Sequence, residues 1–144
     1  MKIIALSRSI SSNETNHKKK YWALAQKLAT IQDINVLWIS GTNRNWTERK
    51  IINQNNEHYL KIKYIQNQEN IFDFLTFLPR ITVELNNVLK NERDAKLIIF
   101  PKKDKLLNQA IKPIEHKIKT YGWSDRDNIQ KILTKIKKII KNGC

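Results

Sequence analysis

The chain has 144 residues, 40% of them hydrophobic, which suits one domain with a buried core and excludes a disordered chain. Its 27 Lys and Arg residues against 13 Asp and Glu residues give a formal net charge of +14. Such an excess attracts polyanions, so we expect a nucleic acid, an anionic membrane surface or a phosphorylated ligand as the partner. The alternative is a solvated basic surface with no such partner.

The residue types that hold metals and cofactors are sparse. Cys144 is the only cysteine, which excludes an intrachain disulfide and a cysteine-based zinc site. The histidines His17, His58 and His116 lack metal-ligand spacing, and no glycine-rich nucleotide loop is present. We therefore expect neither a metal nor a cofactor. No apolar run reaches the ~18 residues of a membrane span and no signal peptide is evident, so we expect a cytoplasmic location.

Residues 2–41 predict a βαβ unit. The segments KIIALS and INVLWIS are continuous apolar runs, the pattern of strands that are covered on both faces. Between them lies an amphipathic helix, NHKKKYWALAQKLATIQ, whose start Asn13 or Thr15 can cap. A helix between two such strands is the crossover that parallel pairing requires.

The middle of the chain predicts two more strands and a long helix. A short helix is expected near residues 47–53. Residues 58–65 alternate between apolar and polar side chains, which predicts a half-exposed strand and favours the edge of the sheet. Residues 70–91 predict a helix that Pro79 breaks or kinks. The segment AKLIIF, residues 95–100, predicts another buried strand.

Residues 102–144 form a basic tail with 12 basic and four acidic residues, +8 of the total charge. A helix is expected over 107–121, kinked at Pro113, with Gly122 in the left-handed position that follows a helix. Ser124 is expected to begin a second helix. That helix carries an apolar stripe of Ile129, Ile132, Leu133, Ile136, Ile139 and Ile140. The stripe favours core packing, and the alternative is a surface for a protein partner.

These elements predict a single α/β domain over residues 1–144. Its fold class is three-layer and Rossmann-like, with a mostly parallel sheet of about four strands, helices on both faces and two C-terminal helices. Residues 1–101 form the Rossmann-like core, and residues 102–144 form a basic helical tail that packs on it.

The loop after the first strand is the place where a ligand is expected. In open parallel sheets, ligands bind beyond the carboxyl ends of the strands, near the switch in strand order. Hydroxyls, amides and a guanidinium suit phosphate groups or sugars, and His17 at the helix start can act as a base. The alternative is a capped, solvated loop. The expected ligand-binding residues are Ser7, Arg8, Ser9, Ser11, Asn13, His17, Thr42 and Arg44.

The basic tail supports a different function, a nucleic-acid-binding protein without catalytic activity. Lysines and arginines contact phosphates, while Trp46, Tyr121 and Trp123 offer rings on which bases can stack. The expected nucleic-acid-binding residues are Lys102, Lys103, Lys105, Trp123, Arg126, Lys131, Lys135 and Lys138.

The order of the segments also resembles a known family. The sequence MKIIALSRSISS, the helix ending ALAQKLA, the strand INVLWISGTN and the segment HYLKIKYIQ follow one another, and IFDFLTFLPRITVELNNVLK precedes AKLIIFP. Over residues 1–101 this pattern resembles the N-terminal Rossmann-like half of GT-B glycosyltransferases, especially of the family-4 type. The segment YGWS before the last helix is similar to the start of the terminal crossover helix of such enzymes.

The resemblance implies an acceptor-binding domain, often basic where it meets anionic membranes. The glycine-rich first loop of that family is absent here, as is the C-terminal Rossmann half that holds the nucleotide sugar. A lone half of this kind is expected to need a partner for any activity. The function that the resemblance implies is therefore a glycosyltransferase-like domain that binds a phosphate-, sugar- or nucleotide-containing ligand.

Overall fold

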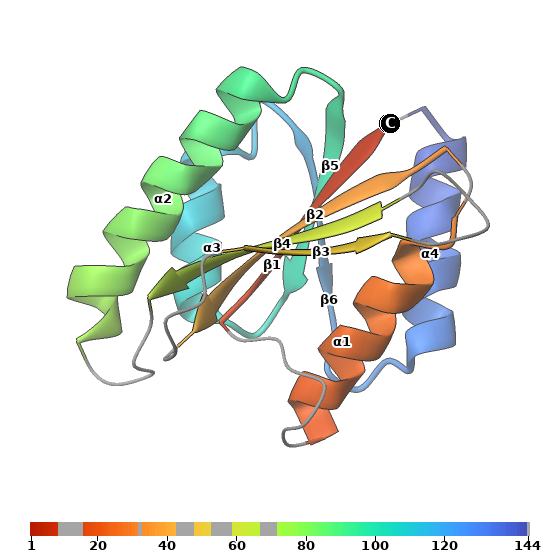
Figure 1. The fold of residues 1–144 in the computed structure, drawn as a ribbon, viewed down its shortest axis with the longest axis horizontal. Helices are drawn as coiled ribbons and strands as arrows, with labels where there is room; N and C mark the ends of the chain where they lie inside the picture. Colours follow the sequence, from red (N-terminus) through yellow and green to blue (C-terminus); the bar gives the residue numbers. More distant parts are fainter. Residues whose placement is uncertain (9–15, 32, 43–47, 53–58, 67–71, 144) are drawn as a thin grey trace.

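The computed structural model describes residues 1–8, 16–31, 33–42, 48–52, 59–66 and 72–143. Within these ranges the chain folds into one sheet with helices on both faces (Figure 1). The strands are β1 (Lys2–Ser7), β2 (Asn35–Thr42), β3 (Glu48–Ile52), β4 (Tyr59–Gln66), β5 (Ala95–Pro101) and β6 (Lys119–Trp123). The helices are α1 (Asn16–Leu28), α2 (Asp73–Asn91), α3 (Lys105–Ile111), the 3-10 turn η1 (Lys112–Ile114) and α4 (Ile129–Lys141).

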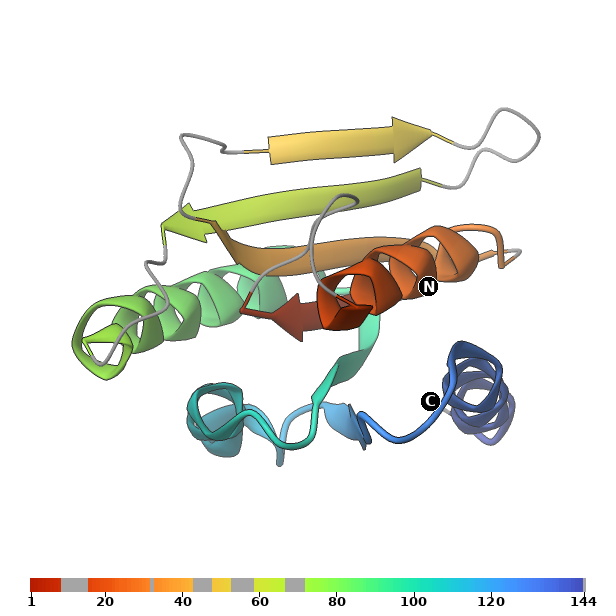
Figure 2. The same cartoon turned by 90° about the horizontal axis from the view of Figure 1, so that it is seen from below.

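The described strands lie in the order β3-β4-β2-β1-β5-β6. Strand β1 pairs in parallel with β2 on one side and with β5 on the other, and β4 and β6 extend the parallel sheet outward. Strand β3 runs antiparallel to β4 at one edge (Figure 2). The chain thus adds β2, β3 and β4 on one side of β1. It then crosses through α2 and adds β5 and β6 on the other side. The strand order consequently reverses between β1 and β5.

The α/β class, the parallel pairing of the first two strands and the helices on both faces are confirmed, but the described sheet has six strands rather than about four. One additional strand is β3, so the helix expected near residues 47–53 was a wrong prediction. The backbone of β3 pairs with β4 in register from Glu48 opposite Lys63 to Ile52 opposite Tyr59. Because β3 occupies the edge, β4 is an inner strand and its predicted edge position was also wrong.

The other additional strand is β6, in the segment expected to end a long helix. Helix α3 stops at Ile111, and Pro113 lies in the 3-10 turn that follows, since proline has no N–H for a continuing helix. Residues Lys119–Trp123 then pair in parallel with β5. Gly122 lies within this strand rather than after a helix, and a Cβ there would come 3.1 Å from the Cβ of Lys102. The glycine therefore permits a close approach of backbone to side chain.

The last two long helices also differ in detail from the predictions. Helix α2 runs without a break from Asp73 to Asn91 although it contains Pro79. Helix α4 begins after Asn128, whose side-chain oxygen accepts a hydrogen bond from the backbone N–H of Lys131 at 2.8 Å. Ser124, the expected cap, instead accepts a bond from the N–H of Arg126 in the preceding turn. Asparagine suits the cap because its oxygen satisfies an N–H that the first helical turn leaves open.

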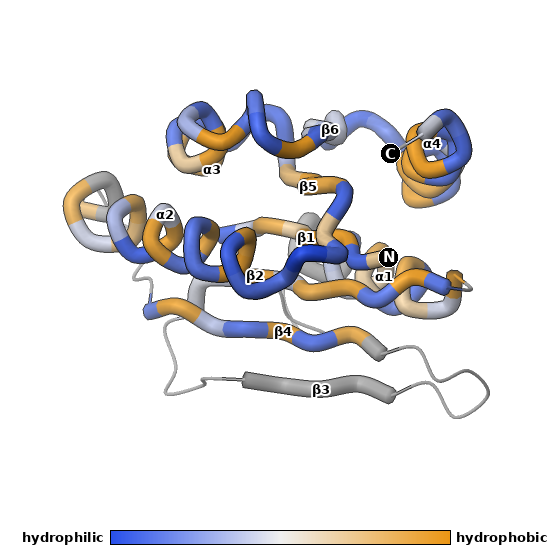
Figure 3. Tube along the Cα trace, turned by 90° about the horizontal axis from the view of Figure 1, so that it is seen from above, coloured by the Kyte–Doolittle hydropathy of each residue, from blue (hydrophilic) through white to orange (hydrophobic). Residues whose placement is uncertain are grey.

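The core has two parts, one on each face of the sheet. In β1, Ile3 and Ala5 face α1 and α4, whereas Ile4 and Leu6 face α2 and α3, because neighbouring side chains of a strand point to opposite faces. Figure 3 shows the hydrophobic side of α4 turned inward and its hydrophilic side outward. The core packing expected for the α4 stripe is confirmed for its central residues, which are Ile132, Leu133 and Ile136.

We expect Ile136→Ala to lower the free energy of unfolding by about 2–5 kcal/mol, because Ile136 is fully buried and its truncation leaves a cavity. Thr134→Ala, on the exposed side of the same helix, serves as the control and should change the free energy by less than about 0.5 kcal/mol. Urea unfolding followed by tryptophan fluorescence measures both. Equal effects of the two substitutions would show that α4 does not complete the core.

Candidate functional site

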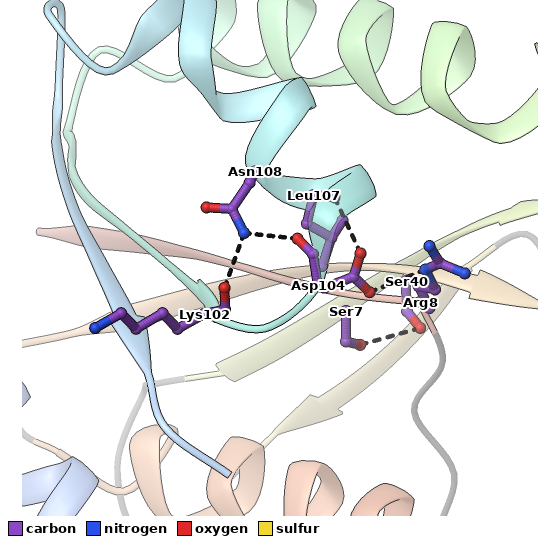
Figure 4. A network of polar contacts seen from close by, with 7 residues as sticks. All are labelled: Ser7, Arg8, Ser40, Lys102, Asp104, Leu107 and Asn108. Atoms are coloured by element: carbon purple, nitrogen blue, oxygen red, sulfur yellow. Dashed lines mark hydrogen bonds and ion pairs between the residues drawn. The ribbon is translucent and has the colours of Figure 1, made fainter. Parts of the chain in front are cut away.

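The reversal of strand order brings an arginine and an aspartate together at the carboxyl edge of the sheet. Arg8 directly follows β1, and Asp104 lies in the loop between β5 and α3. The Nε of Arg8 lies 2.9 Å from Oδ2 of Asp104 (Figure 4). The arginine side chain is 34% exposed and the aspartate side chain 13%. The guanidinium therefore meets solvent on one side and a mostly buried carboxylate on the other.

Asp104 has a second role as the N-terminal cap of α3. Its Oδ1 accepts a hydrogen bond from the backbone N–H of Leu107 at 3.1 Å. One turn further, Nδ2 of Asn108 donates to the backbone carbonyls of Lys102 at 2.9 Å and Asp104 at 2.7 Å (Figure 4). The first turn of α3 thus fixes the loop on both sides of Asp104. The carboxylate that contacts Arg8 is held in place before any ligand arrives.

A chain of buried hydroxyl groups lies at the ends of β1 and β2. Nε1 of Trp38 donates to Oγ of Ser7 at 2.8 Å, and Ser7 in turn donates to Oγ of Ser40 at 3.4 Å (Figure 4 draws the serine pair). Ser40 donates to the carbonyl of Gly41 at 3.1 Å. Ser7 and Ser40 pair in register and are fully buried. These hydroxyls satisfy the indole N–H of Trp38 within the protein.

Three aromatic rings, one each from α1, β2 and β6, pack against one another on the α1 face of the sheet. Tyr21 of α1 lies edge-on to Trp123 of β6, with ring centroids 5.7 Å apart, and Trp38 lies 6.1 Å from Trp123. Burial first, and then the carboxylates of Asp125 and Asp104, raise the pKa of the Tyr21 hydroxyl to about 12. The phenol is therefore a neutral group at physiological pH and can donate a hydrogen bond but not serve as a base.

The residues expected in the ligand site differ in burial, and several of them lie outside the described part of the chain. Arg8 lies at the carboxyl edge as described above. Ser7 and Thr42 are buried, so their side chains are not on the surface of the protein. His17 belongs to the first turn of α1, but its side chain is outside the described part of the chain. The remaining expected residues, which are Ser9, Ser11, Asn13 and Arg44, also lie outside the described residues.

The residues expected to bind nucleic acid do not form one surface. Trp123 is fully buried against Tyr21 and Trp38, so its expected stacking on bases is excluded in this structure. Lys105 begins α3, which covers the opposite face of the sheet from α4. The exposed members of the set are Lys102, Lys103, Lys105, Arg126, Lys131, Lys135 and Lys138.

Two of these lysines have intramolecular partners. Lys131 forms an ion pair of 3.2 Å with Asp127, and Nζ of Lys135 lies 5.9 Å from the ring centre of Tyr121. Tyr121 is half-buried, and burial together with Asp127 raises its pKa above the ordinary value. Lys135 thus lies over a face of the Tyr121 ring on which a base would stack. Tyr121 is therefore less available for stacking than the sequence indicated.

Asp104 and Asn108 are site residues that the sequence analysis did not identify. Both belong to the segment after β5, and only the strand order places that segment beside the segment after β1. Ligands of open parallel sheets bind where the strand order reverses, and this rule identifies both residues once β5 is placed next to β1. Nothing in the local sequence of residues 101–108 gives that placement.

The described site offers groups that suit the recognition of an anion. It combines one arginine, one carboxylate held by a helix cap and a neutral tyrosine, whereas the side chain of Lys102 extends away from Arg8 (Figure 4). A guanidinium can contact phosphate or carboxylate oxygens with two parallel N–H groups. Among the described residues, no three or more His, Cys, Asp or Glu side chains gather in a way that could hold a metal ion.

Comparison with models of known protein families finds no match to this chain, and comparison with curated proteins finds none either. Within the described residues, no helix combines the length and apolar character needed to cross a membrane.

We expect the free energy of unfolding to fall as the pH rises from about 10 to about 12. In this window the unfolded chain has lost the Tyr21 proton while the folded chain retains it, so the folded state binds more protons and rising pH favours unfolding. Tyr21→Phe should remove this part of the decline. Urea unfolding at several pH values measures it.

Titration of tyrosinate absorbance tests the same assignment directly. One of the four tyrosines should titrate near pH 12, and Tyr21→Phe should remove that step. Asp104→Asn should lower the pKa of Tyr21 but leave it above 10.0, because burial is the larger cause. A Tyr21 hydroxyl that titrates at 10.0 in the native protein would contradict its burial between α1 and β6.

Proposed function

We propose that the chain is a glycosyltransferase-like domain that binds a phosphate-bearing sugar or nucleotide at the carboxyl edge of its sheet. The proposal assigns the phosphate to Arg8. It extends the resemblance of residues 1–101 to the N-terminal half of GT-B enzymes, and it places any catalytic activity in an assembly with a partner.

The observation that supports this proposal is the position of Arg8 at the reversal of strand order. The helices that follow β1 and β5, α1 and α3, cover opposite faces of the sheet, and ligands of open α/β sheets bind where the connections part in this way. Arg8 is the residue after β1 and is about one third exposed. A positive charge at that point suits a phosphate group.

The Arg8–Asp104 ion pair gives the site a means of selecting strong anions. A ligand must compete with, or add to, a carboxylate that already lies 2.9 Å from Nε of Arg8. A doubly charged phosphate interacts with a guanidinium more strongly than a neutral sugar hydroxyl does. We therefore expect a phosphate-bearing ligand to bind and an unphosphorylated sugar to bind much less.

Asp104 also positions the arginine before binding. Its carboxylate is fixed by the cap of α3, so the arginine side chain has a defined partner in the unliganded protein. Binding to a side chain that is already ordered loses less conformational entropy than binding to a mobile one. This argues for Asp104 as a positioning residue and for Arg8 as the residue that contacts the ligand.

The decisive experiment is an NMR titration of the 15N-labelled protein with glucose 1-phosphate, uridine diphosphate glucose and glucose. We expect the two phosphorylated compounds to shift the backbone amides of Arg8 and residues 102–107, and glucose to shift them little. Arg8→Gln should weaken binding at least about tenfold, because it removes a charge-assisted contact worth about 1.5–3 kcal/mol.

Arg93→Gln is the matched control, because Arg93 is exposed and lies before β5, at the opposite edge of the sheet. It removes the same charge and should leave binding unchanged. Amide shifts that stay absent from Arg8 and residues 102–107 would refute the site. Equal weakening by the two substitutions would show that overall charge, not this site, attracts the phosphate.

A further inference from the structure

A groove runs between α1 and α4 on one face of the sheet. The two helices pack beside each other over the same half of the core (Figure 1). Two hollows, of about 550 and 400 Å³, lie along them and share Lys27 and Gln130 in their linings, so they adjoin. We call their combined lining the α1–α4 groove. Besides the two shared residues, its polar members are Lys20, Thr30, Arg126, Asp127, Asn128 and Lys137.

Three cations line the groove from both sides. Lys27 lies on α1, whereas Arg126 precedes α4 and Lys137 lies on it. All three are exposed, and none has an ion pair or side-chain hydrogen bond with another described residue. Cations that line one groove and have no ion pair with a described carboxylate create a positive potential there.

The other charged groups at the groove are already engaged. Nζ of Lys20 donates to the backbone carbonyl of Asp125 at 3.0 Å and to that of Asp127, so this lysine joins α1 to the loop before α4. The carboxylate of Asp127 pairs with Lys131 at 3.2 Å, which offsets its negative charge. Bonds to neutral carbonyls leave the charge of Lys20 in place, so it adds to the positive field of Lys27, Arg126 and Lys137.

The shape of the groove favours a chain-like ligand over a bilayer. Its apolar members are recessed: Leu133 is buried, and Ile129 and Ile31 are half-buried. Insertion into a membrane needs apolar side chains that project outward. The large apolar side chains that do project within the described residues, Phe72, Leu75 and Val83, lie at or in α2, which covers the opposite face.

We propose that the α1–α4 groove binds the phosphodiester backbone of a nucleic acid without reading its sequence. Lys27, Arg126 and Lys137 contact phosphate oxygens, while the amides of Asn128 and Gln130 are suited to phosphates and sugars. Among the described residues, no aromatic side chain lines the two hollows, so the proposed mode does not include stacking on bases. The net charge of +14 increases the rate of encounter with such a polyanion.

This site is separate from the carboxyl-edge site around Arg8. It replaces the mixed set of tail residues expected from the sequence by a groove that includes Lys27 and Gln130, which the sequence analysis did not single out. The buried Trp123 has no part in it. A failure of sugar phosphate binding at Arg8 would leave this inference untouched.

The test is a fluorescence anisotropy titration of the full chain with a labelled mixed-sequence RNA of about 16 nucleotides, in KCl from about 0.05 to 0.2 M. The variant Lys27→Gln/Arg126→Gln/Lys137→Gln removes three positive charges from the groove. Each phosphate contact to a single strand contributes about 0.7 to the slope of log affinity against log salt, so the variant should lower the slope by about 2. Its affinity at 0.05 M should fall at least about tenfold.

The matched control is Lys112→Gln/Lys117→Gln/Lys119→Gln, which removes three exposed charges from the segment that runs from η1 to the first residue of β6. Both variants have a net charge three below that of the native chain, and circular dichroism should show both folded. The control should retain the native affinity within about twofold. Equal losses in the two variants would overturn the groove in favour of diffuse surface charge.

Two further results would also overturn the inference. One is RNA binding by the native chain that is weak and does not change with salt. The other is stronger dependence on the groove residues for vesicles that contain an anionic phospholipid than for RNA. That result would assign the cations to a lipid headgroup surface instead of a nucleic acid.

Discussion

Strand β1 is the constraint on which the rest of this structure depends. It has a parallel neighbour on each side, and all six of its residues are buried. Parallel strands cannot be joined by tight turns, so every connection in this part of the chain has to cross a face of the sheet. The helical layers follow from this, because β1 carries apolar side chains on both faces and each face has to be covered.

The same strand determines where recognition can occur. Because the chain places β2 and β5 on opposite sides of β1, the carboxyl ends of β1 and β5 lie side by side, and this brings Arg8 to Asp104. The groove between α1 and α4 arises differently, because both helices cover the same face of the sheet and two hollows lie along them. We propose a single anionic group for the first site and an extended series of charges for the second, and the two sites lie apart in the fold.

The sequence predicts the first βαβ unit, because residues 2–41 carry long apolar runs whose period is clear. It does not predict the strands Glu48–Ile52 and Lys119–Trp123, which are short, lack a long apolar run and gain their stability by pairing with another strand. For the candidate site, the position of Arg8 after a buried strand is readable from the sequence. The role of Asp104 is not, since it depends on which side of β1 the chain returns to.

The hydrogen bond from Lys20 to the carbonyl of Asp125 joins residues 105 positions apart, and β6 and α4 complete the same half of the core as β1 and α1. While the ribosome is still synthesising this chain, α1 therefore has no α4 to pack against. That half of the hydrophobic core must wait in contact with water, or with a chaperone, until the last third of the chain has emerged. The opposite half, which α2 and α3 cover, can assemble earlier.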